Sequence, residues 1–369
     1  MKEIRSIINA YNKIDFTSVK AALATVVRVE GSSYRRTGAR MLVLDNGTYL
    51  GGISGGCLEG DALRRAQYAI VQNKPSVITY DTTQEDGYQI GVGLGCNGII
   101  DVLITPLLPG DDSNPVPVLA EISETREPRI LVSITDSIKG NIALGKMLLY
   151  KKDELFLESF TVKEISSSVL KEIKQSLGER TTRTINYETA EGPVTVFIEV
   201  IMPAIHLVVF GGNYDIYPLI RIAKELDWRL TVVTSTIKAN KSLFTIVDKV
   251  IDDRSTEEPL IDSFTAIMLM AHDYKTDYKN LKRMIVSNVP YIGLLGPRKR
   301  SQKMFDDLET EGITVPEEKR ECIFAPAGLD IGAKNPEEIA LSIVAEIQSY
   351  FSGKKGTSLR LKPGTIHDN

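Results

Sequence analysis

The sequence predicts an α/β protein in which a mixed α+β domain (1–203), built from two pseudo-repeats, precedes a doubly wound parallel sheet (204–351) and a polar tail (352–369). Two observations lead to this fold class. The apolar pattern of residues 1–108 recurs over residues 119–202. From His206 onward, short and fully apolar segments alternate with helical ones, as in a Rossmann-like sheet covered by helices on both faces.

The repeat is clearest when Leu23–Val27 is aligned with Ile130–Ile134, at an offset of 107 residues. The same offset aligns three further pairs: Gly38 with Gly145, Leu63 with Leu170, and Tyr80 with Tyr187. Asp101–Ile104 matches Glu199–Met202 at an offset of 98, so we expect the second copy to lack nine residues around 91–96. Since the second copy keeps its apolar pattern without them, these residues point to function.

The elements of the first copy follow from its periodicity and turn residues. We expect helices at 2–11 and 58–72, and strands at 22–29, 39–44, 48–53, 77–80 and 99–105. Asn46-Gly47 marks a hairpin between two of these strands. Leu58, Ala62 and Ala66 share one helical face. Residues 109–117, rich in Pro, Gly and Asp, are expected to be the loop that ends this copy.

The second domain should alternate strands and helices. We expect strands at 207–210, 230–233, 266–270, 291–295 and 322–324, and helices at 216–226, 279–286, 299–308 and 336–351. The tail is rich in Lys, Gly, Ser and Pro, so we expect it to be poorly ordered unless a partner chain holds it.

Composition limits the function classes. A net charge of −4 and a pI near 5.7 give no electrostatic footprint for nucleic acid or for a membrane surface. No apolar run approaches the ~18 residues of a membrane span, and the first twenty residues lack the apolar core of a signal peptide. Three cysteines fit a reducing compartment, so we expect a cytoplasmic protein.

Cys57 is the strongest chemical candidate. It lies in the glycine-rich turn 51–60, directly before a helix whose free N–H groups favour an anion or a thiolate. The second copy has Glu164 at the aligned position, which favours a function for Cys57 over packing. The candidate ligand-contacting residues of this turn are Ser54, Gly55, Gly56, Cys57 and Glu59.

Two further loops of the first copy carry candidates. Gly95 and Cys96 belong to a second glycine-rich loop, and Cys57 and Cys96 are predicted to face one pocket. Without a C-x-x-C pair or nearby histidines, the two cysteines do not form a recognisable zinc site, and a reversible disulfide between them stays open. The third loop has guanidinium groups suited to an anion, with the candidates Ser32, Ser33, Arg35, Arg36 and Arg40.

In the second domain, Gly211 and Gly212 follow the first strand, where a dinucleotide fingerprint would lie. Asn213 and Ile216 occupy its later glycine positions, a pattern compatible with nucleotide binding but unfavourable for hydride transfer. Further candidates are expected at the carboxyl edge of the sheet, where open α/β folds bind ligands: His272, Asp273, Arg298, Gly328 and Asp330.

These motifs together resemble the xanthine dehydrogenase accessory factor family (XdhC/CoxI). The matching segments are 31–33, 38–41, 54–59, 95–96, 272–273, 295–298 and 325–332. The resemblance implies a chaperone, rather than an enzyme, that binds molybdenum cofactor (molybdopterin). Such a chaperone holds the cofactor during sulfuration and delivers it to a xanthine dehydrogenase-type molybdenum hydroxylase. It further suggests a cysteine desulfurase as a second partner, and we expect a homodimer.

Two alternatives remain at this point. An NAD(P)-dependent oxidoreductase would use the strand, glycine turn and helix at Gly211. A thiol enzyme would instead carry persulfide sulfur on Cys57. The difference between the two copies favours the cofactor-binding accessory role, with its site in the first copy.

Overall fold

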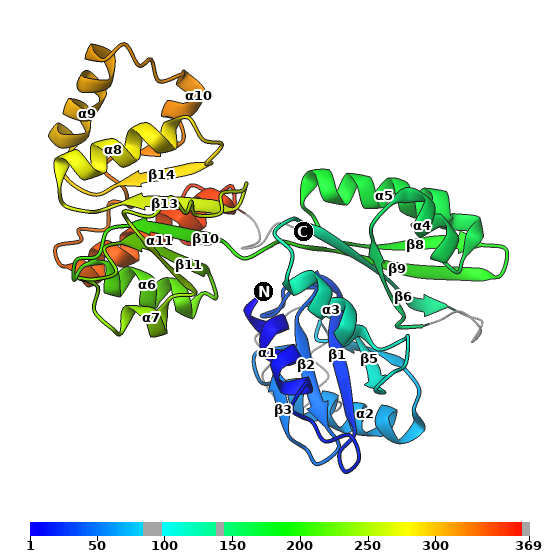
Figure 1. Ribbon diagram of the computed structural model, residues 1–369. Helices are drawn as coiled ribbons and strands as arrows, with labels where there is room; N and C mark the ends of the chain where they lie inside the picture. The colour runs from blue at the N-terminus through cyan, green and yellow to red at the C-terminus, as the bar shows by residue number, and fades with distance from the viewer. Residues whose placement is uncertain (84–97, 138–143, 364–369) are drawn as a thin grey trace. The chain divides into compact units, whose positions relative to one another are not determined.

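The computed structural model describes residues 1–83, 98–137 and 144–363 (Figure 1). The chain forms two compact units, Met1–Pro203 and Ala204–Asn369, and each is described by itself. The first unit contains two antiparallel sheets and the second a parallel sheet of six strands, which confirms the predicted fold class.

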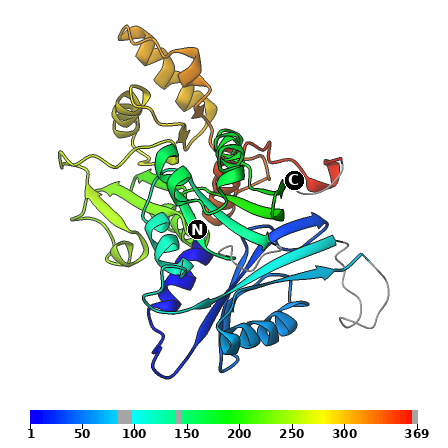
Figure 2. The same ribbon diagram turned by 90° about the vertical axis from the view of Figure 1, so that its right-hand side faces the viewer.

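The first copy folds as one sheet with strand order β3-β2-β1-β5-β4. Its elements are α1 (Lys2–Tyr11), β1 (Ala21–Gly31), β2 (Arg40–Leu44), β3 (Tyr49–Gly51), α2 (Glu59–Gln72), β4 (Ser76–Asp81) and β5 (Gly98–Leu107). Helix α2 covers one face of this sheet through Ala62, Ala66 and Ile70 (Figure 2, light blue).

The second copy repeats this plan with four strands in the order β7-β6-β9-β8. Its elements are α3 (Pro115–Ser123), β6 (Arg129–Ser137), β7 (Met147–Tyr150), α4 (Asp153–Ser159), η1 (Lys163–Ile165), α5 (Ser166–Glu179), β8 (Arg183–Thr189) and β9 (Gly192–Ile201). Helix α5 covers its sheet through Val169 and Ile173, which are equivalent to Ala62 and Ala66.

Helix α3 corrects the predicted loop at 109–117. Asn114 caps it by accepting the N–H of Val116 at 3.0 Å, and Pro115 occupies the first helical position, which needs no N–H donor. The prolines read as loop residues therefore begin a helix. Helix α3 shares a buried cluster with α1, so each copy begins with a helix.

Hydrogen bonding also corrects the predicted alignment of the first strands. Gly38 donates its N–H to Val26 O at 2.7 Å, and Gly145 donates to Ile134 O at 3.0 Å. The strands therefore align at an offset of 108 (134 − 26), although the glycines align at 107. The ungapped alignment was wrong by one residue in this strand, a slip that exchanges the two faces of a sheet.

The last strands align at an offset of 94 rather than 98. Val26 pairs with Val102, and Ile134 pairs with Val196 (196 − 102). The second copy therefore lacks 13 residues (107 − 94), and the excess in the first copy belongs to the connection between β4 and β5. Offsets of 94 and 98 differ by an even number, so both keep the alternating apolar pattern in phase and sequence alone could not separate them.

The two sheets of the first unit meet through the faces that α2 and α5 leave open. Val27, Leu103 and Phe197 form one buried cluster there, and Thr184 Oγ1 donates a hydrogen bond to Val27 O. In a second buried cluster, the apolar faces of α1 and α3 pack together with residues of both sheets, such as Leu23 and Leu131. The duplicated copies therefore share a core.

The second unit has the strand order β12-β11-β10-β13-β14-β15, all parallel. Its strands are β10 (His206–Phe210), β11 (Arg229–Thr234), β12 (Lys249–Asp252), β13 (Thr265–Leu269), β14 (Tyr291–Leu294) and β15 (Ile323–Phe324). Its helices are α6 (Ile216–Glu225), α7 (Leu243–Ile246), α8 (Tyr274–Ile285), α9 (Arg298–Thr310), α10 (Glu317–Arg320) and α11 (Pro336–Phe351), and η2 (Leu359–Leu361) follows. Helices α6 and α11 cover one face of the sheet, while α8 and α9 cover the other.

Strand β12 and the short helices α7, α10 and η2 were missed in this unit, and helix α8 was misplaced. Strand β12 is only four residues long and ends in an aspartate, so it lacks the apolar run of the other strands. Helix α8 begins at Tyr274 instead of 279, because the Asp273 carboxylate accepts the N–H of Thr276 at 2.8 Å and caps the helix earlier.

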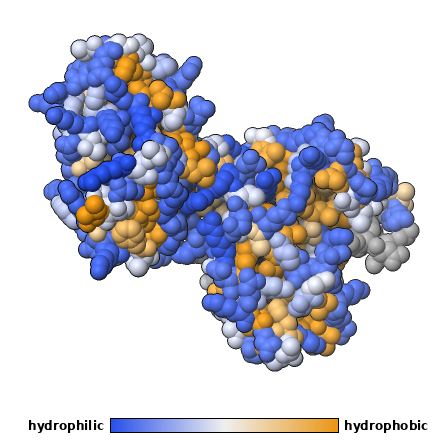
Figure 3. Space-filling view, in the orientation of Figure 1, coloured by the Kyte–Doolittle hydropathy of each residue, from blue (hydrophilic) through white to orange (hydrophobic). Residues whose placement is uncertain are grey.

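Hydrophilic and hydrophobic residues are interspersed over the visible face of both units (Figure 3). Within the described residues, no helix combines the length and apolar character that crossing a membrane requires.

Candidate functional site

The glycine-rich turn before α2 encloses the carboxylate of Glu59. This carboxylate accepts the N–H groups of Ile53 at 3.2 Å, Ser54 at 2.8 Å and Gly56 at 3.0 Å. The Ser54 hydroxyl also donates to Glu59, and it accepts the N–H of Leu58 at 3.0 Å. The N–H groups of Ile53, Ser54, Gly56 and Leu58, which precede α2, are therefore occupied within the turn, and Glu59, expected to contact a ligand, instead holds this turn together.

Hydrogen bonding makes Glu59 a stronger acid. Burial raises the pKa of its carboxyl group, but hydrogen bonds from Ser54 and from backbone N–H groups outweigh burial and lower the pKa below its usual 4.5. A lowered pKa in the folded state contributes stability above pH 4.5 that is lost as the pH falls through and below that value.

Replacing Glu59 with glutamine is expected to remove this pH-dependent contribution and to lower the unfolding free energy near neutral pH by about 1.5–3 kcal/mol. The measurement is urea unfolding of both proteins from pH 7 to pH 3. The difference between them should shrink as the pH falls. A difference that stays constant over this range would contradict the role given to the carboxylate.

Cys57 lies at the open side of the same turn. Its side chain is exposed, and its thiol is free. Gly56 before it has a φ of +114°, and a Cβ there would have no atom within 4 Å. A Cβ on Gly55 would lie 3.1 Å from the ring of Tyr34. The loop with the predicted guanidinium groups, residues 32–40, therefore packs against this turn, and we call it the arginine loop. The structure therefore presents the thiol beside the arginine loop.

Two of the three predicted guanidinium groups are already paired. Arg40 is 1% exposed and forms a two-pronged ion pair with Glu199 of the second copy, with Nη1 to Oε1 at 2.9 Å. Arg35 pairs with Glu3 of α1. Among the described residues, Arg36 has no carboxylate partner, and its buried Nε has no hydrogen-bond acceptor. Of the three guanidinium groups predicted to face an anion, Arg36 is thus the one without a carboxylate partner among the described residues.

Two remaining candidates of the first copy, Ser32 and Ser33, belong to this loop. Ser32 is exposed, whereas Ser33 is buried, with an Oγ that has no partner among the described residues. Gly98 begins β5 and pairs with Gly31 of β1. Gly95 and Cys96 lie outside the described residues, so their proximity to Cys57 stays a prediction.

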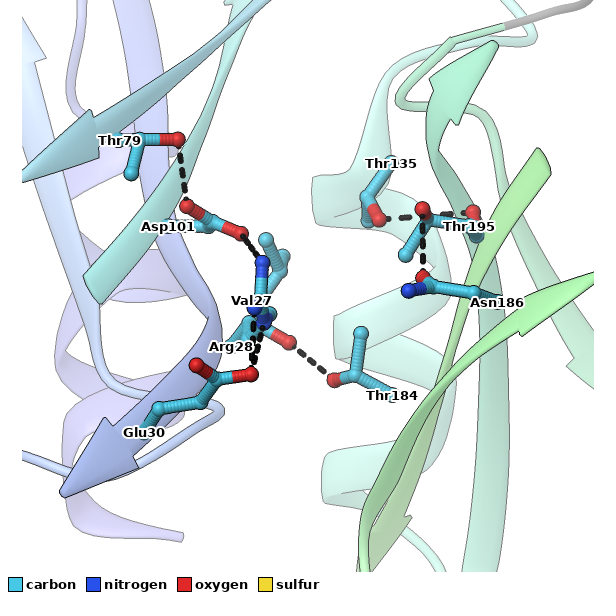
Figure 4. A network of polar contacts seen from close by, with 9 residues as sticks. All are labelled: Val27, Arg28, Glu30, Thr79, Asp101, Thr135, Thr184, Asn186 and Thr195. Carbon is cyan, nitrogen blue, oxygen red and sulfur yellow. Dashed lines mark hydrogen bonds and ion pairs between the residues drawn. The ribbon is translucent and has the colours of Figure 1, made fainter. Parts of the chain in front are cut away.

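Figure 4 compares equivalent polar positions in the two copies. In the first copy, Asp101 pairs with Arg28 at 3.2 Å and accepts a hydrogen bond from Thr79 at 2.7 Å. In the second copy, Thr195 and Asn186 occupy the positions of Asp101 and Thr79, and they share a hydrogen bond of 2.9 Å. The Asp101 carboxylate of the first copy is thus replaced by the neutral Thr195, and Arg28 by Asp136, so the ion pair has no counterpart in the second copy and the asymmetry extends beyond the glycine loops.

In the second unit, His272 lines a cavity of about 560 Å³ at the carboxyl edge of the sheet. We call this the histidine cavity, and Tyr214, Asp215, Gly328 and Asp330 also line it. His272 has a φ of +61°, and its Nε2 lies 2.6 Å from Asp215 Oδ2. A non-glycine residue in this strained conformation is common at functional sites.

The predicted residues of the second unit do not form one group. Gly211, Gly212 and Asp273 line a different opening, also about 560 Å³, which we call the basic cleft. Its cationic residues are Lys238, Arg254, Lys275, Lys279 and Arg283. Arg298 begins α9, is exposed, and lines neither cavity.

Several residues of these sites were missed by sequence reasoning. Glu199 had a signal, because it is a lone charge within the apolar strand β9. Lys275 and Lys279 are four residues apart on α8, a spacing that places both on one helical face. Asp215 had no distinguishing pattern, since its contact with His272 joins residues 57 positions apart. Within the described part of the chain, no group of three or more His, Cys, Asp or Glu side chains is arranged to hold a metal ion.

These features define a class of protein in which a duplicated α+β domain with an exposed thiol in one copy precedes a Rossmann domain. The model described as the XdhC and CoxI family matches residues 17–81, and the model described as the XdhC Rossmann domain matches residues 207–347. A Bacillus subtilis (strain 168) protein, named as a probable xanthine dehydrogenase subunit, is 31% identical over 342 residues, covering 89% of this chain and 92% of that protein. The chain therefore belongs to the XdhC and CoxI family, as its motifs predicted.

Two further similarities extend over most of the chain. The molybdenum cofactor insertion chaperone PaoD of Escherichia coli (strain K12) is 22% identical over 329 residues, covering 89% of this chain and 83% of PaoD. A crystal structure described as a xanthine dehydrogenase from Bacillus halodurans superimposes with a TM-score of 0.75 at 25% identity, covering 98% of both chains.

Proposed function

We propose that this protein is an accessory factor that binds molybdenum cofactor, holds it while its terminal sulfido ligand is installed, and delivers it to a xanthine dehydrogenase-type hydroxylase. Family membership and the name of the relative PaoD support the cofactor. The name of the B. subtilis relative supports the client enzyme. The observation that carries the proposal is the exposed Cys57 thiol in the first copy, where the second copy has Glu164.

The described residues fit such a cofactor in part. A thiolate is a soft ligand suited to a metal with sulfur in its coordination sphere, and Cys57 would supply it. The phosphate of the pterin would be held by Arg36, which has no carboxylate partner among the described residues, and by the buried hydroxyl of Ser33. Arg40 and Glu59 do not fit as ligands, because each already serves the fold.

The test is retention of released molybdenum cofactor by the full chain. Replacing Cys57 with serine is expected to reduce retention by about tenfold or more, the effect of losing roughly 1.4 kcal/mol of binding free energy. Cys322→Ser is the matched control, because that thiol lies in the second unit and contacts Glu318 O at 3.3 Å. Absence of retention by the unmodified protein, or equal losses in both variants, would refute the proposal.

A sulfur-carrying role for Cys57 is the second candidate, and the exposure of its thiol favours it. After incubation with a persulfide donor, mass spectrometry should then find one added sulfur atom on Cys57, and Cys57→Ser should not acquire it. Labelling of Cys322 instead of Cys57 would count against this role.

A further inference from the structure

The basic cleft lies where a Rossmann sheet usually receives a nucleotide. Gly211 and Gly212 follow β10, Thr234 ends β11, and Arg254 follows β12, so the carboxyl ends of three neighbouring strands contribute. Ala271, after β13, completes this edge. The reversal of strand order between β10 and β13 makes this the switch point at which ligands bind in open α/β sheets.

The cleft has an excess of positive charge. Five cationic side chains and two carboxylates, Asp253 and Asp273, line it. Among the described residues, Lys238, Arg254, Lys275 and Lys279 form no ion pair, although the carboxylates of this unit pair with several cations elsewhere. The Asp273 carboxylate is occupied as the cap of α8. Counter-charges offset this cluster only in part, since Glu258 pairs with Arg283 while Asp252 and Asp273 attract Arg254 and Lys275. The remaining cations repel one another, and a polyanionic ligand would relieve this repulsion.

The backbone at the floor of the cleft comes unusually close to its neighbours. A Cβ on Gly212 would lie 2.2 Å from Thr234 Oγ1, and a Cβ on Gly211 would lie 2.5 Å from Met270 O. Glycines at these positions leave peptide groups uncovered for a ligand. The Ser235 hydroxyl is buried at the same place and has no hydrogen-bond partner in the part of the chain that the structure describes. It supplies a polar group for a ligand to satisfy.

Asn213 limits how far such a ligand extends. Its side-chain amide donates to Ala271 O at 3.3 Å, which links the loops after β10 and β13. Asn213 and Ala271 line the basic cleft, whereas the next residues of the two loops, Tyr214 and His272, line the histidine cavity. The bridge therefore separates two halves of the crevice that a dinucleotide would have to span.

We propose that the basic cleft binds a nucleotide through its phosphate groups and that the Asn213 bridge confines the ligand to one half of the crevice. The recognised chemistry is a phosphate-bearing nucleoside, held by Lys238, Arg254 and the lysines of α8. The strand after the glycine turn ends in Thr234 and has no carboxylate to hold a ribose, so phosphate recognition carries the affinity. This inference goes beyond the proposed cofactor handling and does not depend on it.

The experiment is calorimetric titration of the full chain with ADP, inorganic phosphate and NAD⁺ as separate probes. ADP is expected to bind, with an affinity that falls as salt is added, because the cations are exposed. Lys279→Gln and Lys238→Gln should each weaken ADP binding by about tenfold. Lys249→Gln is the matched control, since that lysine lies outside the cleft and pairs with Glu257 at 2.5 Å. Thermal unfolding of each variant checks that it folds.

Three outcomes would overturn the proposal. ADP does not bind, or it binds equally to the Lys279→Gln and Lys249→Gln variants, or inorganic phosphate binds as tightly as ADP. NAD⁺ is expected to bind no more tightly than ADP, because its second half cannot cross the bridge. NAD⁺ binding tenfold tighter than ADP would refute the confinement by Asn213.

Discussion

Replacing Arg40 with methionine is expected to destabilise the unit Met1–Pro203 by about 3–5 kcal/mol, because it leaves the Glu199 carboxylate buried without its partner. The guanidinium of Arg40 also donates to Gly38 O at 2.7 Å, so the substitution removes a support of the arginine loop. Since Arg40 belongs to one copy and Glu199 to the other, this pair links the duplicated halves.

The measurement is urea unfolding followed by two signals. Far-UV circular dichroism follows both units, whereas Trp228, the single tryptophan, follows only Ala204–Asn369. The dichroism transition should move to lower urea by about 1–2 M, and the Trp228 transition should not move.

Two further variants test whether loss of the buried ion pair causes the destabilisation. Arg64→Met is the control, since Arg64 forms an exposed ion pair with Asp61 that is expected to contribute about 0–1 kcal/mol. The double variant Arg40→Met with Glu199→Leu should recover most of the lost stability, because replacing a buried pair with apolar groups is often neutral. Equal effects of Arg40→Met and Arg64→Met would contradict the importance of the buried pair.

Replacing Gly211 with alanine is expected to destabilise the unit Ala204–Asn369 by about 3 kcal/mol or more. Gly211 has a φ of +151°, and its added Cβ would lie 2.5 Å from the backbone oxygen of Met270. Backbone strain and overpacking each cost roughly 1–3 kcal/mol, and a backbone atom cannot move aside as a flexible side chain can.

For this variant the Trp228 fluorescence transition should move to lower urea. Gly178→Ala provides the contrasting case, because Gly178 lies in helix α5 and its added Cβ would meet no atom within 4 Å. That substitution should be neutral or should stabilise the first unit by up to about 1 kcal/mol. A Gly211→Ala protein as stable as the parent would contradict the close approach of Gly211, after β10, to Met270, after β13.

The strands and helices of both units were predictable largely because burial imposes a period on the sequence. The helix at Pro336 could be predicted to the residue, since it has both a capping asparagine and an N-terminal proline. The offset of the last strands in the repeat could not, because the even shift between 98 and 94 preserves an alternating pattern. The offset of the first strands could not either, because β1 is buried on both faces and shows no alternation over Ala21–Val27. Register depends on hydrogen bonds between distant residues, and these leave little trace in local sequence.

The position of the candidate site was predictable from the sequence, but the partners of its charged residues were not. The sequence located the Cys57 turn and the arginine loop, yet it could not reveal which charges were already paired. Glu59 and Arg40 were both expected to meet a ligand, and both instead have partners within the chain. Such pairing is a tertiary property, so a cluster of charged residues alone does not distinguish a binding site from a structural contact.

The carboxylate inside the glycine turn has a consequence for how a carrier works. A protein that takes up a small molecule and then releases it must pass through an empty state in every cycle. Because Glu59 accepts three backbone N–H groups of its own turn, these hydrogen bonds hold the turn in shape without cargo. If cargo binds beside Cys57, as proposed, its departure would leave the N–H groups of Ile53, Ser54 and Gly56 still paired with Glu59.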